Sequence, residues 1–508
     1  MATLARNTAW LTAAKTLSVS IYALFGLFLP RLVSIEINGL YTLMSTLLFF
    51  GSMAATFGVP TILVRTIARD PKQAGQVFVD ARRALLLGAT IAAVCVLLYI
   101  LGEMLWQGNV QTERIILGML VCCIIFWDAM GGLGEALFQA HEEMVWPALL
   151  DVLTGVLRAG GALGVLIFFP HWGLFGVFAT FLLGSMIRGW LLPFQAQKQF
   201  LSSQAITPSS RNALALLQES MGVALFRVLR MLRNRLDSLL LGILIVPVAG
   251  FALVETSDLA RGLYGQGMRV VFVFHAFTMA LNMAVFPRLT RLSSESEANE
   301  KSADEARFQF SRVLRYQAWW SAPMATALFV WAGPVAGVFG EEYRFGVEGI
   351  SGTTADVLRI LAAAVLLDCI GGPVGMLMVG RKEMDKKLPL FGLTFALSSV
   401  LLNILLIPRW GIVGAAWASL GAAAVEVITK AIWTSRLLGS AKYMAGSLPY
   451  VALSIGIAFC FSIDQLKLAE RPLLGGVLLL AVYFSATWMF GWVDSGITDR
   501  IRRRMKNV

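Results

Sequence analysis

Long apolar runs recur along almost the whole chain, and they constrain its fold more than any other feature of the sequence. Each run approaches the roughly 20 residues that an α-helix needs to cross about 30 Å of hydrocarbon. Hydrophobic residues make up 57% of the 508 positions, charged residues make up 14%, and the mean hydropathy is +0.72, which lies outside the range of soluble proteins. The sequence therefore predicts an all-α integral membrane protein.

Polar breaks between the apolar runs predict about fourteen transmembrane helices. The predicted spans are 9–30, 40–64, 84–105, 115–138, 146–169, 173–195, 224–246, 249–287, 313–339, 356–379, 388–407, 411–435, 446–463 and 473–493. The eighth run is longer than one crossing needs, and Gly262, Gly265 and Gly267 would allow it to bend.

Basic residues gather in alternate connections between these spans. With a cytoplasmic N-terminus, the inside segments carry clusters such as Arg65 to Arg83 and Arg500 to Lys506, whereas the outside loops carry few cations. The positive-inside rule therefore predicts a multi-pass protein with both termini in the cytoplasm. This topology explains most of the net charge of +11, because the cations do not cluster with stacking aromatics as they do in nucleic-acid-binding proteins.

An internal repeat indicates how the spans are grouped. Pro170-His-Trp-Gly-Leu-Phe-Gly precedes the sixth span and resembles Pro408-Arg-Trp-Gly-Ile-Val-Gly, which precedes the twelfth. Copies six spans apart have the same orientation, so they predict two six-helix lobes related by a pseudo-two-fold axis along the membrane normal. The predicted segments are an N-terminal lobe at 1–210, a C-terminal lobe at 211–440, and 441–508 with two further helices and a basic tail.

Short motifs follow one another in an order that is moderately specific. They are Asn38-Gly-Leu-Tyr, Phe57-Gly-Val-Pro, Arg65-Thr-Ile-Ala-Arg69, Asn234-Arg-Leu-Asp-Ser-Leu-Leu-Leu-Gly242, Phe286-Pro-Arg-Leu-Thr-Arg291, Met378-Val-Gly-Arg381, Leu402-Asn-Ile-Leu-Leu-Ile-Pro408 and Gly411-Ile-Val-Gly-Ala-Ala416. Their order around one topology resembles the polysaccharide transporter family, the Wzx-type flippases of lipid-linked oligosaccharides in the MATE-like (MOP) superfamily.

The resemblance implies a two-lobed transporter that alternates between inward-open and outward-open forms in the bacterial cytoplasmic (inner) membrane. Its substrate would be a polyprenyl-pyrophosphate-linked oligosaccharide, carried from the cytoplasmic to the outer leaflet for O-antigen or exopolysaccharide synthesis. Membrane lipids, a polysaccharide polymerase and glycosyltransferases would be its partners. The motifs do not identify the glycan, and the chain is expected not to be an enzyme.

Ionisable groups inside apolar spans are costly in hydrocarbon, so they are candidates for lining a cavity. Guanidinium suits a pyrophosphate, because its fork of donors matches phosphate oxygens and it stays charged. The candidate substrate-binding residues are Lys15, Arg158, Arg230, Arg233, Asn234 and Arg269. An alternative for Arg227 to Arg235 is a cytoplasmic collar whose side chains snorkel to the headgroups.

Carboxylates inside the spans could couple proton or sodium entry to transport, because their protonation can depend on which side is open. The candidates are Asp237, Glu255, Asp258, Asp368 and Glu426. Structural pairing with nearby arginines is an alternative for Asp237 and Asp258, and an intrahelical pair with Lys430 is one for Glu426. Nucleotide, cofactor and metal motifs are absent from the sequence, so we expect an ion gradient as the energy source.

Two other functions fit such a chain. A cation-coupled drug or metabolite exporter of the same superfamily would have an acidic cavity, whereas these predicted stripes have a basic surplus. A membrane polysaccharide polymerase or another membrane enzyme is disfavoured by the short outside loops and by the lack of a histidine-centred cluster among the three histidines.

Overall fold

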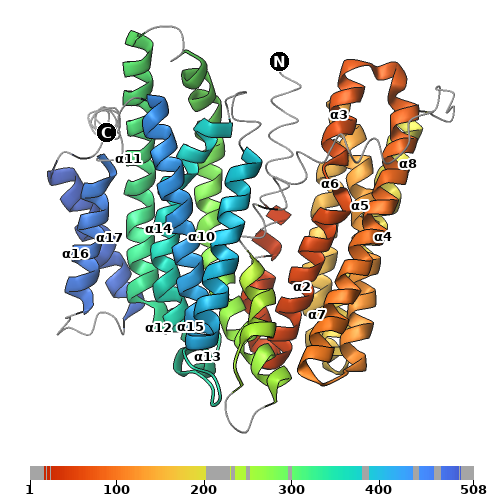
Figure 1. Cartoon of the computed structure of the whole chain (residues 1–508), viewed down its shortest axis with the longest axis horizontal. Helices are drawn as coiled ribbons and strands as arrows, with labels where there is room; N and C mark the ends of the chain where they lie inside the picture. The colour runs from red at the N-terminus through yellow and green to blue at the C-terminus, as the bar shows by residue number, and fades with distance from the viewer. Residues whose placement is uncertain are drawn as a thin grey trace, which may run out of the picture. The chain divides into compact units, whose positions relative to one another are not determined.

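The computed structural model describes residues 17–18, 20–22, 24–201, 229, 235–247, 252–295, 300–379, 388–438, 446–462, 471–490 and 492. Every regular element in these residues is helical (Figure 1). Six helices of the described part are long and apolar enough to cross a membrane. The predicted all-α membrane protein is thereby confirmed, and the total of fourteen spans stays a prediction.

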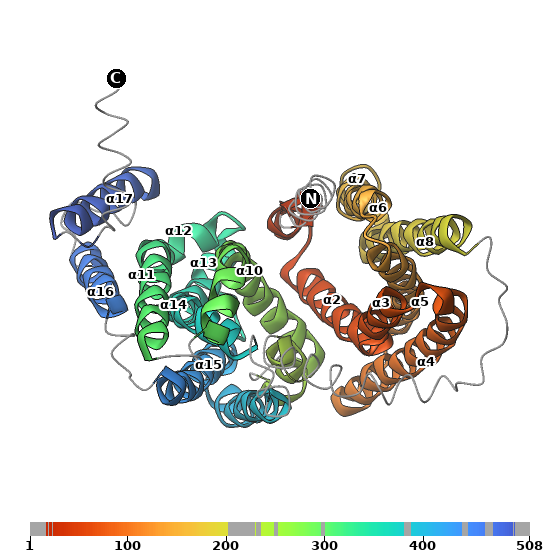
Figure 2. The same ribbon diagram turned by 90° about the horizontal axis from the view of Figure 1, so that it is seen from above.

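The chain divides into two compact units, of which the first contains residues Met1–Arg269, Glu348–Ser351 and Leu388–Ala415. Its helices include α2 (Ile35–Thr56), α3 (Val59–Arg69), α4 (Ala74–Gln107), α5 (Thr112–Ala140), α6 (Val145–Gly155), α7 (Gly161–Phe168) and α8 (Gly173–Phe200). Within this unit α5 packs against α2, α3, α4 and α8 (Figure 2). A helix at 235–244 and the first parts of α10 (Leu253–Glu295) and α15 (Leu388–Leu438) also belong to it.

The predicted second span, 40–64, is two helices rather than one. Phe57 and Gly58 have φ angles of +40° and +74°, so the chain leaves the helix after Thr56 and resumes at Val59 as α3. Glycine adopts this left-handed conformation without steric cost, and a proline in the first turn suits the start of α3. The motif Phe57-Gly-Val-Pro therefore encodes a break within the apolar run.

Glycines bring the helix backbones of the first unit into close contact. A Cβ atom on Gly88 would overlap the backbone of Ala55, and one on Gly189 would overlap the backbone of Trp127. Small residues at such crossings are typical of helices packed within a membrane, where apolar burial between helices gains little over contact with lipid. Hydrophobicity thus selects the spans, whereas the small residues set how closely these helices pack.

The second unit contains residues Val270–Val347, Gly352–Lys387 and Ala416–Val508. Its elements include the second halves of α10 (Leu253–Glu295) and α15 (Leu388–Leu438), together with α11 (Glu300–Val330), α12 (Ala332–Gly337), α13 (Glu341–Phe345), α14 (Thr354–Val379), α16 (Leu448–Ser462) and α17 (Pro472–Met489). The stretch called α15 is two helices that meet at Gly411, whose φ is +55°. This break separates the predicted spans 388–407 and 411–435.

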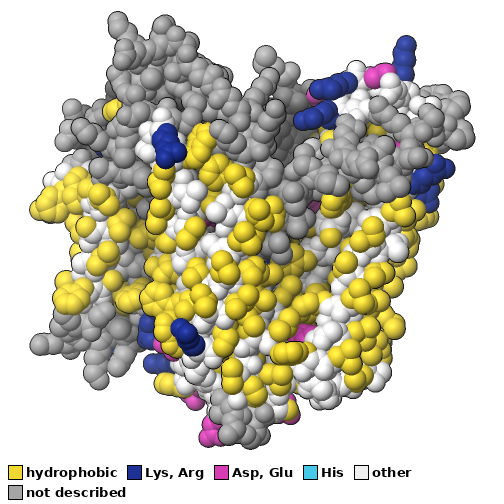
Figure 3. All heavy atoms as spheres, viewed as in Figure 1, with side chains coloured by type: hydrophobic (Ala, Val, Ile, Leu, Met, Phe, Trp, Pro, Cys, Tyr) yellow, Lys and Arg dark blue, Asp and Glu magenta, His cyan; other side chains and the backbone are white. Residues whose placement is uncertain are grey.

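Apolar side chains cover much of the outer surface of the helices (Figure 3). Leu105, Phe168 and Val477 are 75%, 76% and 71% exposed, respectively. Such side chains would be unfavourable in water and are satisfied by lipid tails. The exposed apolar surface and the long apolar helices together describe a multi-pass membrane protein.

Candidate functional site

Arg269 of α10 is a partly buried cation held by neutral groups. Its Nη1 atom donates to Asn38 Oδ1 at 2.7 Å and to Gln266 Oε1 at 2.9 Å, and its Nη2 atom donates to Thr42 Oγ1 at 2.7 Å. Its guanidinium carbon lies 5.0 Å from the centroid of the Tyr41 ring. These amide and hydroxyl oxygens orient the guanidinium and carry no net charge themselves.

The crossing of α2 and α10 creates this arrangement. A Cβ atom on Gly39 would overlap the backbone of Asp258, and one on Gly262 would overlap the backbone of Ile35. A Cβ atom on Gly265 would come within 2.6 Å of Thr42. α10 is one continuous helix through Gly262 and Gly265, and these two glycines let α2 come close to it.

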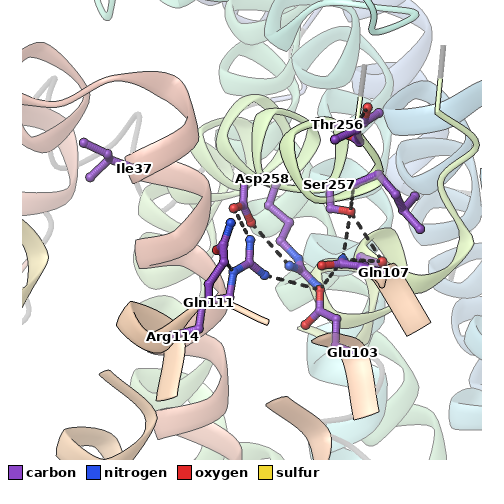
Figure 4. Close-up of polar contacts among 12 residues, drawn as sticks. Ile37, Glu103, Gln107, Gln111, Arg114, Thr256, Ser257 and Asp258 are labelled. Atoms are coloured by element: carbon purple, nitrogen blue, oxygen red, sulfur yellow. Dashed lines mark hydrogen bonds and ion pairs between the residues drawn. The ribbon is translucent and has the colours of Figure 1, made fainter. Parts of the chain in front are cut away.

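Four buried charges form a ring near the start of α10 (Figure 4). Arg114 pairs with Asp258, Arg261 Nη2 lies 2.5 Å from Glu103 Oε1, and the remaining contacts are Arg261 with Asp258 at 3.6 Å and Arg114 with Glu103 at 3.9 Å. The exposed fractions are 2% for Glu103, 1% for Arg114, 7% for Asp258 and 0% for Arg261. Positive and negative charges alternate around this charge ring, and they sum to zero.

Side chains of α4 extend the charge ring to the helix at 235–244. Tyr99 donates to the carbonyl of Leu239 at 2.9 Å, Trp106 to that of Ile243 at 3.2 Å, and Gln107 to that of Gly242 at 3.1 Å. Arg261 Nε donates to the carbonyl of Ser238 at 2.9 Å. Two of these carbonyls lie in the last turn of the helix, where intrahelical donors are missing, so the side chains cap it.

A second charged cluster lies among α5, α6, α8 and η2 (Val156–Gly160), a π-helical turn that contains Arg158. Arg158 pairs with Asp128 and also donates to Ser185 Oγ. Arg188 contacts Glu135 at 2.5 Å and Asp151 at 3.0 Å. Asp151 and Arg158 are seven residues apart in the sequence, and each side chain has an ion-pair partner on a neighbouring helix.

Asp237 is 1% exposed and is bound by two buried side chains. The Tyr264 hydroxyl donates to Oδ2 at 2.5 Å, and Asn403 Nδ2 donates to Oδ1 at 3.0 Å. Asn403 Nδ2 also donates to the carbonyl of Ser399, while Asn403 Oδ1 is buried and accepts no hydrogen bond. The phenol and the amide nitrogen thus both donate to one buried carboxylate, and a carboxylate is a group able to take up a proton.

The remaining predicted residues have diverse surroundings. Glu255 is exposed at the start of α10, and Glu426 forms an ion pair with Lys430 one turn further along α15. Asp368 lies in α14, but its side chain is outside the described part of the structure. Four of the predicted substrate-binding residues also fall outside the described residues, namely Lys15, Arg230, Arg233 and Asn234.

Several charged residues of these clusters were not among the candidates predicted from the sequence. Glu103, Asp128 and Arg188 all lie inside predicted apolar spans, so the cost of charge in hydrocarbon was an available signal for them. Arg114 directly precedes the predicted span 115–138. Its near-complete burial depends on α10, which lies far away in the sequence, and no local pattern predicts that contact.

A sequence profile of the family described as polysaccharide biosynthesis protein matches residues 4–293, which is more than half of the chain. The chain belongs to this family. Among curated proteins, it is similar to the probable flippase AglR of Haloferax volcanii, with 21% identity over 518 aligned positions that cover 100% of this chain and 99% of AglR. The family membership confirms the resemblance recognised from the sequence motifs.

Solved structures identify the fold of this family member. The lipid II flippase MurJ in an inward closed conformation matches with a TM-score of 0.65 and 14% identity, over 94% of this chain and 98% of MurJ. An inward-facing MATE multidrug transporter of the MOP superfamily matches with a TM-score of 0.57 and 15% identity, over 83% and 95% of the two chains. The chain therefore has the fold of MurJ and MATE transporters.

Proposed function

We propose that this protein is a flippase that carries polyprenyl-pyrophosphate-linked oligosaccharide repeat units from the cytoplasmic to the outer leaflet by alternating access. The product would be a cell-surface polysaccharide, such as O-antigen or exopolysaccharide. Family membership and the similarity to a probable flippase support this assignment. The protein would act in a bacterial inner membrane beside the polymerase and glycosyltransferases that use and make its substrate, and it would carry out no covalent chemistry.

The observation that carries the proposal is the environment of Arg269. Its guanidinium is only partly buried and is oriented by the neutral oxygens of Asn38, Thr42 and Gln266. A guanidinium held in a fixed orientation within a largely apolar helix presents a fork of donors, and such a fork suits phosphate oxygens. We assign Arg269 to the pyrophosphate, and Lys15, Arg230, Arg233 and Asn234 remain proposed to share that role. Arg158 already has an acidic partner, which makes a phosphate contact less favourable there.

Proton or sodium entry is the proposed energy source. The buried group around Asp237 supports it, because the carboxylate is far from bulk water and the Asn403 Oδ1 acceptor is unused. Entry of a proton would neutralise this buried carboxylate. Glu255, Asp368 and Glu426 remain further candidates, whereas both carboxylate oxygens of Asp258 already face arginines.

The proposed orientation follows from α4. Its first turns carry Arg82 and Arg83, close to Arg65, Arg69 and Lys72 in the sequence, whereas its other end carries Glu103 and the charge ring. The twenty residues between Arg83 and Glu103 span about 30 Å of helix, roughly the thickness of the hydrocarbon. We therefore place the basic end in the cytoplasm and the charge ring near the outer surface.

A binding measurement tests the proposed substrate. Purified protein is titrated with a polyprenyl-pyrophosphate oligosaccharide and, separately, with the same glycolipid lacking phosphate, while intrinsic tryptophan fluorescence is followed. We expect Arg269→Gln to weaken binding of the pyrophosphate form by about 10- to 100-fold, because a charge-assisted hydrogen bond contributes about 1.5–3 kcal/mol. Binding of the phosphate-free form should not change.

The matched control is Arg359→Gln, which removes an exposed ion pair with Asp356 at 3.0 Å. Exposed pairs of this kind contribute about 0–1 kcal/mol, so this variant should bind as the wild type does. Equal affinity of the wild type and Arg269→Gln for the pyrophosphate form would show that Arg269 does not contact the phosphate groups.

A further inference from the structure

The charge ring joins α4 and α5 to the first part of α10, and the predicted lobe boundaries assign these helices to different lobes. Glu103 and Arg114 come from α4 and α5, whereas Asp258 and Arg261 come from α10. The first pair lies in the predicted N-terminal lobe at 1–210, and the second pair lies in the predicted C-terminal lobe at 211–440. Within the first compact unit, two ion pairs of the ring join these two parts of the chain, namely Arg114 with Asp258 and Glu103 with Arg261.

Backbone packing at the same place is tight. Gly39 and Gly262 leave no space for a side chain between α2 and α10, and Gly242 lies against the guanidinium of Arg261. Gln107 donates both to the carbonyl of Gly242 at 3.1 Å and to Ser257 Oγ at 3.1 Å. In this conformation, a bulky ligand would have no passage between these helices.

The energetics of the charge ring suit a contact that forms and breaks. Taking four charges out of water is costly, and this cost offsets much of their mutual attraction. The ring is also incompletely hydrogen-bonded, because Glu103 Oε2, Arg114 Nη1, Asp258 Oδ1 and Arg261 Nη1 are buried and make no hydrogen bond. Separation of the helices would return all four charged groups to water. The closed ring therefore has a defined geometry and can also open again.

We propose that Glu103, Arg114, Asp258 and Arg261 form an electrostatic latch that closes the outer end of the transport path and opens once in each cycle. Asp258 and Arg269 are eleven residues apart on α10, so the latch lies about 16 Å along the helix from Arg269. A pyrophosphate bound at Arg269 would leave outward only after the latch has opened. This inference rests on the proposed alternating-access function. The strength of the latch would set the equilibrium between conformations with a closed and with an open outer end.

Distance measurements between two spin labels test the latch without any substrate. The labels are placed through Asn109→Cys, in the turn between α4 and α5, and Val246→Cys, after the helix at 235–244, in a chain whose five native cysteines are replaced. We expect Arg114→Gln to raise the ratio of long to short label distances by about tenfold, since typical conformational couplings of 1–3 kcal/mol correspond to 5- to 150-fold.

Arg114→Gln removes one of the two arginines that contact Asp258, and this loss alone could impair folding. The double variant Arg114→Gln with Asp258→Asn avoids this problem because it removes one charge of each sign, and it should show a similar shift. Arg359→Gln, on an exposed ion pair, is the matched control and should not shift the distances. Unchanged distances in a folded, monodisperse double variant would overturn the latch. A shift in these distances without any binding of pyrophosphate lipids would retain the latch and refute the proposed substrate.

Discussion

Two arginines of α10, eight residues apart, show how identical side chains acquire different roles. Arg261 is completely buried and faces Glu103 and Asp258, whereas Arg269 is partly exposed and is held by neutral oxygens. The first guanidinium is neutralised and holds helices together. The second contacts neutral oxygens of α2 and α10, and it is the one that we propose as a ligand contact. The positions of the two arginines on α10 do not distinguish these roles. The difference arises from contacts with other helices, α4 for Arg261 and α2 for Arg269.

At the same scale, Asp237 provides a test of ion coupling. Asp237→Asn keeps the size of the side chain and an oxygen that can accept from Tyr264, but it removes the group that gains a proton or binds a cation. We expect this variant to bind the pyrophosphate lipid like the wild type and to lose the acceleration that an ion gradient gives. Flipping assays with and without the gradient measure this difference, with the exposed Glu341→Gln as control. Full acceleration in Asp237→Asn would assign the coupling to another group.

At the scale of elements, the crossing of α2 and α10 positions both Arg269 and the latch. Gly39→Ala places a methyl group against the backbone of Asp258, so we expect it to lower the thermal midpoint of the purified protein, consistent with an overpacking cost of about 1–3 kcal/mol. Gly102→Ala on α4 has no atom within 4 Å of the added Cβ, so it should leave the midpoint unchanged or raise it through better helix propensity. Equal midpoints for the two variants would contradict the close crossing.

Hydrophobic patterning predicted the elements better than it predicted their contacts. The spans 115–138 and 388–407 were placed correctly because an apolar run of membrane length has few alternatives. The break at Phe57 and Gly58 was missed, since the run stays apolar through it. The charge ring could not be predicted in the same way, because Arg114 and Asp258 are 144 residues apart and their meeting depends on tertiary packing.

At the scale of the whole molecule, the proposed transport of a lipid-linked saccharide connects these clusters. Family membership and fold are consistent with that function. In it, a cation at Arg269 holds the pyrophosphate, a buried carboxylate at Asp237 responds to the ion gradient, and the latch controls the outer exit. All three places lie in the first compact unit. Transport would then need all three, whereas binding would need only the first.

The most direct test is the flipping of a fluorescent polyprenyl-pyrophosphate oligosaccharide in proteoliposomes that contain the purified protein, with and without a proton or sodium gradient. The account predicts movement between leaflets that exceeds protein-free vesicles, increases with the gradient and is lost in Arg269→Gln but retained in Arg359→Gln. Folded protein that moves none of several such donor lipids above the protein-free rate would contradict the proposed function.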